Sequence, residues 1–200
     1  EEFITSIPEM ELTREAELKQ LPSAVDNSAN IYMPPIFNQR TSGSCTQCAE
    51  IGYVLTYELN RHRNLPAGTS WYGNGENNTN LYHPFFTYNF LNEGVHGKGT
   101  PTGSGFNIVK TNGCPSLVDY YDPILQDLSN TMSSKYWMNG SDKYINASSN
   151  TIYNNNNIYS FKITWNTTYS SLNNLKHWLS NHNSDSNVGG LAVIIIDSKY

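Results

Sequence analysis

A cysteine at the start of an apolar segment constrains this chain more than any other feature. Residues 49–59, which follow Cys45, are mostly apolar, and the pattern predicts a helix over residues 45–63. The apolar positions lie nearly all round this helix, which indicates burial on several sides. A thiol at a helix N-terminus lies at the positive end of the backbone dipole, which favours the thiolate. Cys45 is therefore the candidate nucleophile of the chain.

A glutamine precedes this cysteine by one short loop. The chain runs Asn38-Gln39-Arg40-Thr41-Ser42-Gly43-Ser44 before it reaches Cys45. A thiolate attacks carbonyl carbon, and a side-chain amide placed nearby donates to the oxyanion that forms. Cys45 and Gln39 are therefore the predicted catalytic residues.

The same segment resembles the active-site motif of the papain-like cysteine peptidases. Phe37-Asn38-Gln39 followed by Gly43-Ser44-Cys45 is similar to the family's Asn-Gln, three residues, Gly-Ser-Cys-Trp-Ala. Ser42 stands where the family has a disulfide cysteine, and Thr46 stands where it has tryptophan. The motif fits a divergent, bacterial-type branch that lacks the first family disulfide.

Weaker similarities follow in the family order along most of the chain. They lie at residues 21–26, 82–91, 103–114, 120–123 and 190–197. The resemblance implies an α+β, papain-like two-lobed fold, with a helical first lobe and only the start of the β-rich second lobe. It divides the chain into an N-terminal arm or propeptide remnant at 1–20 and a peptidase domain at 21–200 that lacks its C-terminal portion.

The local pattern predicts further elements after the helix over 45–63. Helices are expected at residues 83–92, 104–112 and 170–181, the second of them ended by Gly113. Strands are expected at residues 158–165 and 190–196, the latter buried. Residues 139–157 are polar and of low complexity, which is typical of an insertion or a mobile loop. This order of helices before strands agrees with an α+β class.

The resemblance also implies a function and a substrate-binding segment. The expected activity is that of a cysteine endopeptidase, which hydrolyses peptide bonds through a Cys45 acyl-enzyme. Gly99, Thr100 and Pro101 would hold the substrate backbone as an added strand. Ile195 would line the pocket for the second residue before the cut.

The catalytic histidine of such an enzyme is not evident in the sequence. The family places it about 130–150 residues after the cysteine, and His177 and His182 fall in that window. In the family, however, it follows the strand that residues 192–196 resemble, so we expect it beyond Tyr200 or on a second polypeptide, with its Asn or Asp partner. His177 is expected in a helix beside the core, and His182 in a solvated loop.

Two other functions stay open on the same residues. Thr46 and the missing histidine suggest a catalytically inactive, papain-like peptide-binding module, and an acyl or peptide transferase would use the same acyl-enzyme. Cys45 and Cys48 form a C-x-x-C, but no second pair exists for zinc and no βαβ pattern surrounds it. No metal site and no cofactor are expected.

Composition narrows the class of protein. The chain has 200 residues, a net charge of −5 and only 14% charged residues, so nothing suggests nucleic acid, and no apolar run is long enough to span a membrane. This mix suits a secreted, cell-surface or periplasmic enzyme acting on peptides. The odd number of cysteines leaves one thiol free, while Cys48 and Cys114 either pair or stay buried and reduced.

Overall fold

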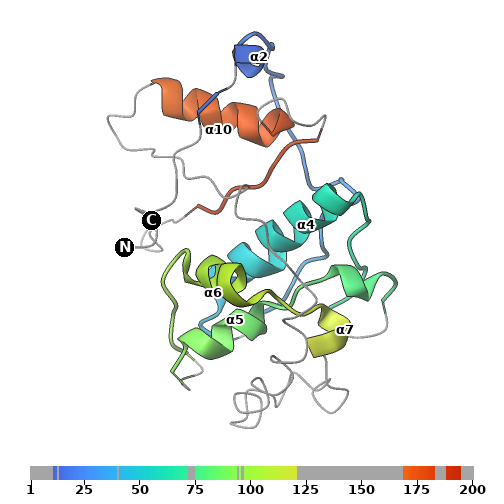
Figure 1. Cartoon of the computed structure of the whole chain (residues 1–200), viewed down its shortest axis with the longest axis vertical. Helices are drawn as coiled ribbons and strands as arrows, with labels where there is room; N and C mark the ends of the chain where they lie inside the picture. The colour runs from blue at the N-terminus through green and yellow to red at the C-terminus, as the bar shows by residue number, and fades with distance from the viewer. Residues whose placement is uncertain are drawn as a thin grey trace. The chain divides into compact units, whose positions relative to one another are not determined.

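Figure 1 shows a computed structural model of the chain. It describes residues 11–12, 14–39, 41–71, 75–93, 95, 97–120, 169–182 and 188–194. Throughout these ranges the regular structure is helical, and none of them contains a strand. The chain divides into a first unit, Glu1–Phe3 with Ile31–Asn156, and a second unit, Ile4–Asn30 with Asn157–Tyr200.

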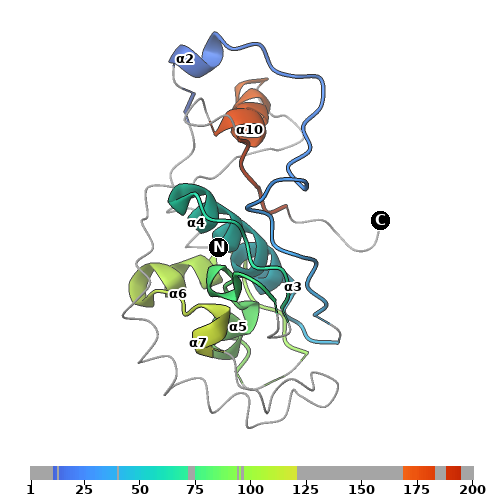
Figure 2. The ribbon, with the colours of Figure 1, turned by 90° about the vertical axis from the view of Figure 1, so that its right-hand side faces the viewer.

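The first unit is built around one long helix. Three consecutive elements form it without a break: α3 (Cys45–Gln47), η1 (Cys48–Leu55) and α4 (Thr56–Arg63), as Figure 2 shows. These bounds confirm the helix predicted over residues 45–63. Element η1 is a π-helix, and there the Thr56 hydroxyl donates to the carbonyl of Ile51 at 3.0 Å, five residues back. Such wide turns occur frequently at functional sites.

Shorter helices pack around this central helix. Helices α5 (Pro84–Leu91) and α6 (Ser104–Asn112) both contact η1 and each other, and α7 (Leu117–Tyr120) contacts the short turn η2 (Asn78–Asn80). Both figures show this cluster around the central helix. The helices predicted at 83–92 and 104–112 are thereby confirmed. The largest fully buried apolar side chains come from the central helix, from α5, α6 and α7, and from the residues that follow η2: Ile51, Leu55, Tyr57, Leu81, Tyr82, Phe86, Tyr88, Val109 and Leu117.

His83 starts helix α5 from within the core. Its Nδ1 accepts a hydrogen bond from the backbone N–H of Phe85 at 3.1 Å, and Pro84 takes the first helical position. The ring packs edge-on against Phe37 and contacts Tyr120. Burial lowers the pKa of His83 to about 3, so the ring is neutral and Nδ1 can accept. His83 therefore has a local structural role at the start of α5.

Glycines with positive φ bound helix α6. Gly103 precedes it with φ 85°, and Gly113 follows it with φ 78°. Other residues adopt this region at a cost, so the two glycines fix where the helix begins and ends. The end predicted at Gly113 is therefore confirmed.

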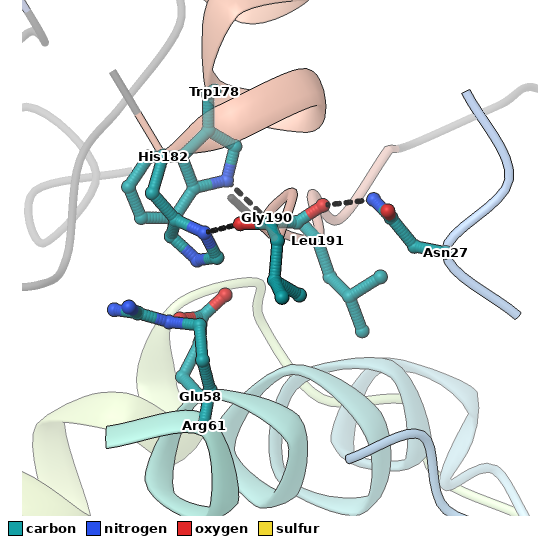
Figure 3. A network of polar contacts seen from close by, with 8 residues as sticks. Asn27, Glu58, Arg61, Trp178, His182, Gly190 and Leu191 are labelled. Atoms are coloured by element: carbon teal, nitrogen blue, oxygen red, sulfur yellow. Dashed lines mark hydrogen bonds and ion pairs between the residues drawn. The ribbon is translucent and has the colours of Figure 1, made fainter. Parts of the chain in front are cut away.

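The second unit contains α2 (Arg14–Glu17), α10 (Tyr169–Asn181) and the segment 188–194. Its described contacts converge on the end of α10, as Figure 3 shows. The Asn27 amide donates to the carbonyls of Leu179 at 2.9 Å and Gly190 at 3.0 Å. The Trp178 indole donates to the carbonyl of Leu191 at 2.8 Å. Side chains thus hold the segment around Asn27 and residues 188–191 against one helix. The bounds of α10 confirm the helix predicted at 170–181.

Two predictions for this unit are wrong. His182 is not solvated: it is 2% exposed, its ring lies 4.5 Å from that of Trp178, and its Nδ1 lies 2.5 Å from the carbonyl oxygen of Val188. Residues 190–194 form no strand, and Ile194 is 73% exposed. In the described part of the chain, the Gly190 N–H donates to the Trp178 carbonyl of helix α10. A helix does not provide the ladder of backbone hydrogen bonds that a strand forms with a neighbouring strand. The strand predicted at 158–165, the segment 139–157 and residues 195–196 lie outside the described residues.

We expect the core around the central helix to depend on Ile51. Ile51→Ala empties a fully buried site and should lower the free energy of unfolding by about 2–5 kcal/mol, measured by urea denaturation. Ile36→Ala makes the same change at a side chain that is 89% exposed, and should cost about 0.5 kcal/mol or less. Equal losses in the two variants would show that Ile51 is not part of the stabilising core.

Candidate active site

Cys45 is the first residue of the central helix, and its side chain is exposed. Ser44 occupies the position before the helix, but its side chain does not cap it. Instead the Ser44 hydroxyl lies 2.6 Å from that of Ser42 and 3.5 Å from the sulfur of Cys48. The exposed thiol therefore stands at the helix N-terminus without a side-chain cap beside it.

The backbone amide of Cys45 lies in the first turn of the central helix. Among the residues that the structure describes, no acceptor binds the Cys45 N–H, whereas the Cys48 N–H already donates to the carbonyl of Ser44 at 2.9 Å. First-turn amides carry the positive end of the helix dipole. An anion that forms next to the Cys45 sulfur would find this donor beside it.

The other cysteines have the opposite environment. Cys48, one helical turn further on, is buried, and burial raises the pKa of its thiol to about 12 despite its hydrogen bond with Ser44, which lowers it. Burial also raises the pKa of the Cys114 thiol. Both remain protonated and act as small apolar residues, as one of the two sequence-based alternatives held. Cys45 is the exposed thiol of the three.

Gln39 lies in a tight turn that precedes the helix. Its side-chain Nε2 donates to the carbonyl of Ser42 at 3.2 Å, and the Ser42 N–H and hydroxyl donate back to the Gln39 carbonyl at 3.2 and 2.9 Å. The amide therefore points at the loop that leads into Cys45, where one of its two N–H groups is used. The described structure contains no hydrogen bond between Gln39 and Cys45.

The loop 97–101 lies directly against the start of the central helix. A Cβ at Gly43 would stand 2.5 Å from the carbonyl oxygen of Lys98, so only glycine allows this approach. The same carbonyl accepts a hydrogen bond from the Tyr88 hydroxyl at 2.9 Å. On the other side of Cys45, the Gln47 amide donates to the hydroxyl of Thr100 at 3.0 Å.

These contacts place the loop of Gly99, Thr100 and Pro101 against residues that flank Cys45 in the sequence. Cys45 lies between Gly43 and Gln47 in the sequence, and Gly99 lies between their two partners, Lys98 and Thr100. Gly99 is exposed, and beyond its two chain neighbours no heavy atom of the described residues lies within 4 Å of the place where its Cβ would be. Thr100 is buried and holds the loop, while Pro101 is exposed.

Two residues central to this arrangement were missed in the sequence. Gln47 and Glu50 are both fully buried in the first turns of the helix. The Glu50 carboxylate accepts hydrogen bonds from the backbone N–H groups of Gly103 and Gly105, and burial raises the pKa of Glu50 to about 7 against their effect. A detectable signal was present: two polar residues three positions apart lie in a helix predicted to be buried on several sides.

Three other residues considered in the sequence belong to the second unit. Ile195 lies outside the described residues, and His177 and His182 lie in helix α10 and directly after it. His177 is buried in α10, as predicted, and burial lowers its pKa. In the described part of the chain no histidine hydrogen-bonds the Cys45 sulfur.

We expect Glu50→Gln to remove a pH dependence of stability. Because the native pKa is about 7 and the ordinary value is 4.5, the fold retains a proton that the unfolded chain loses. The stabilisation is full below about pH 4.5 and is lost as the pH rises through about 7, with roughly 3 kcal/mol as the upper limit. Urea unfolding at about pH 5 and pH 8 should show the wild type losing stability relative to the variant.

Glu76→Gln is the matched control for this measurement, since Glu76 is exposed. Parallel pH dependences for the wild type and Glu50→Gln would contradict the buried, protonatable carboxyl. The expected result is that the free energy of unfolding of the wild type, minus that of Glu50→Gln, becomes smaller or more negative from about pH 5 to about pH 8.

Neither a metal-binding cluster, nor a membrane-spanning helix, nor a similar known protein was found for the described residues or the sequence. Within the described ranges, no three His, Cys, Asp or Glu side chains gather as a metal ion would need, and no helix has the length and apolar character to cross a membrane. A scan of protein-family models, a search of curated proteins and a search of solved structures found no match to this chain. The residues around Cys45 therefore carry the functional proposal.

Proposed function

We propose that this chain is part of a papain-like cysteine endopeptidase and supplies its helical lobe, in an α+β fold whose β-rich lobe comes from elsewhere. The motif from Phe37 to Cys45 supports this proposal. The described helices agree with a helical lobe around the nucleophile. The observation that carries the proposal is the exposed thiol of Cys45 at the start of a buried helix, whose neighbours Gly43 and Gln47 contact the loop on either side of Gly99.

In the proposed reaction the Cys45 thiolate attacks the carbonyl carbon of a peptide bond. The oxyanion would accept hydrogen bonds from the Cys45 N–H and from the N–H of Gln39 that does not bind Ser42. The C–N bond then breaks, the amine leaves with a proton from an imidazolium, and a thioester remains on Cys45. Water hydrolyses the thioester, which releases the acid and restores the thiol.

The imidazole and its Asn or Asp partner would come from sequence beyond Tyr200 or from a second polypeptide. This assignment follows the family order, in which the histidine comes after the strand that residues 192–196 resemble. A thiolate held only by a helix dipole lacks the acid that protonates the leaving amine. Turnover therefore requires this additional part.

The substrate backbone would lie along residues 99–101. Gly99 has no side chain and open space on its exposed side, so an extended peptide can approach its N–H and C=O. Thr100 turns its hydroxyl inward to Gln47, which leaves the outer side of the loop to the peptide. Ile195 remains the proposed lining of the pocket for the second residue before the cut. The proposed setting is secreted, cell-surface or periplasmic.

A non-catalytic peptide-binding module is the second candidate. It is favoured by the Gln39 amide, which binds the Ser42 carbonyl, and by Thr46 in place of tryptophan. Such a module would bind peptide at Gly99 without releasing products. Product analysis with and without an amine acceptor separates hydrolysis, transfer to the amine and binding alone.

We expect Cys45→Ala to abolish both peptide hydrolysis and labelling by a peptidyl chloromethyl ketone. The reagent alkylates the nucleophilic sulfur, and peptide mass spectrometry identifies the modified residue. Cys48→Ala is the matched control and should keep the label on Cys45, because the Cys48 thiol is buried and protonated. Undiminished labelling of Cys45→Ala would refute the nucleophile.

In the protein that includes the part supplying the histidine, we expect Gln39→Ala to lower kcat by about 100- to 1,000-fold, as the loss of one oxyanion donor does in other enzymes. Alkylation of Cys45 by iodoacetamide, which forms no oxyanion, should change little. Gln20→Ala changes an exposed glutamine outside the site and serves as the control. An unchanged kcat in Gln39→Ala would remove Gln39 from the catalytic residues.

A further inference from the structure

Two buried polar side chains connect the nucleophile's helix to the loop proposed to bind substrate. Gln47 and Glu50 lie two and five residues after Cys45, and neither is exposed. They are three positions apart, so both reach the same side of the helix. That side faces the segment from Thr100 to Gly105, more than fifty residues away in the sequence.

Every polar group of the Gln47 side chain has a partner. Its Nε2 donates to Thr100 Oγ1 at 3.0 Å and reaches Glu50 Oε2 at 3.5 Å, while its Oε1 accepts from the Thr87 hydroxyl at 2.6 Å. Gln47 thereby ties the loop at Thr100 and helix α5 to the turn that follows Cys45. Because hydrogen bonds are directional, together they fix both the position and the orientation of the loop relative to the helix.

Glu50 holds the next part of the same segment. Its carboxylate accepts from the N–H groups of Gly103 and Gly105, where helix α6 begins. A Cβ at Gly105 would lie 2.0 Å from Gln47 Oε1 and 2.9 Å from Glu50 Oε2, so the backbone approaches both side chains as closely as glycine permits. Residues 100–105 are therefore held at two points, Thr100 and the start of α6.

These contacts offset part of a cost in stability. Burying an ionisable carboxyl and an amide costs free energy, and the hydrogen bonds to Thr100, Gly103 and Gly105 recover part of it. What apolar packing lacks is directional fixing of a loop backbone. Burial accordingly raises the pKa of Glu50 to about 7.

We propose that Gln47 and Glu50 are positioning residues, which set the place of Gly99 relative to the Cys45 sulfur and thereby the binding of the substrate backbone. This inference rests on the proposed function, in which Cys45 is the nucleophile and Gly99 binds peptide. Neither side chain touches the substrate. Both act through the loop, so their loss should weaken the recognition of peptides and leave the reactivity of the sulfur intact.

Two alkylating reagents test this inference on the full chain with any polypeptide that copurifies. A peptidyl chloromethyl ketone needs the loop and the sulfur, whereas iodoacetamide needs the sulfur alone. Gln47→Met removes the hydrogen bond to Thr100 at similar volume. Glu50→Gln keeps one acceptor oxygen and sets an NH₂ group against one glycine N–H. In each variant, inactivation by the peptidyl reagent should slow about tenfold or more, chiefly through weaker binding, with iodoacetamide rates within about twofold.

Glu58→Gln is the matched control, since it makes the same change in helix α4, where Glu58 pairs with Arg61 at 3.2 Å (Figure 3). It should leave both rates unchanged. Should Gln47→Met fail to fold by circular dichroism, Thr100→Val removes the same hydrogen bond from the loop side. Far-ultraviolet spectra of all variants should match the wild type.

Each result decides between the proposals. Equal slowing with both reagents would show that the two residues only support the helix, and unchanged rates with the peptidyl reagent would show that they do not position the loop. Either result overturns this inference and leaves Cys45 as the nucleophile. If the wild type is not labelled on Cys45 by the peptidyl reagent, the proposed function fails and the positioning role falls with it.

Discussion

The buried contact of Gln47 and Glu50 with the start of helix α6 is the constraint on which the rest of this site depends. Two buried polar side chains from the first turns of the central helix contact the backbone at the start of α6. The absence of a Cβ at Gly105 allows this close approach. Because the two segments lie far apart in the sequence, the contact can form only when the helices of the first unit have packed. The geometry around Cys45 is therefore a product of the whole unit and not of one motif.

The same packing separates two thiols that lie one helical turn apart. Cys48 faces the interior, where burial raises its pKa to about 12, while Cys45 stands exposed at the helix start with its backbone N–H open among the described residues. A reactive sulfur needs access and a nearby donor, and an inert one needs neither. The C-x-x-C spacing therefore marks one candidate nucleophile and one core residue.

Local sequence signals predicted the helical part of the fold well. The helix over 45–63 and the end of α6 at Gly113 follow from apolar periodicity and from a glycine with positive φ, which are properties of short segments. The loop that approaches Cys45 was named through the family resemblance, but its partners were not, because Thr100 and Gly103 meet Gln47 and Glu50 through tertiary packing. The burial of His182 depends on its contacts with Trp178 and Val188, which form when residues 188–191 fold back against the preceding helix α10 and leave no apolar periodicity in the sequence.

A crystal structure of the protein alkylated by a peptidyl chloromethyl ketone tests the central claim most directly. It should show a thioether on the Cys45 sulfur, a peptide backbone extended beside Gly99, and Gln47 and Glu50 in their contacts with Thr100 and Gly103. An adduct on another residue, or a peptide that leads away from Gly99, would contradict the account.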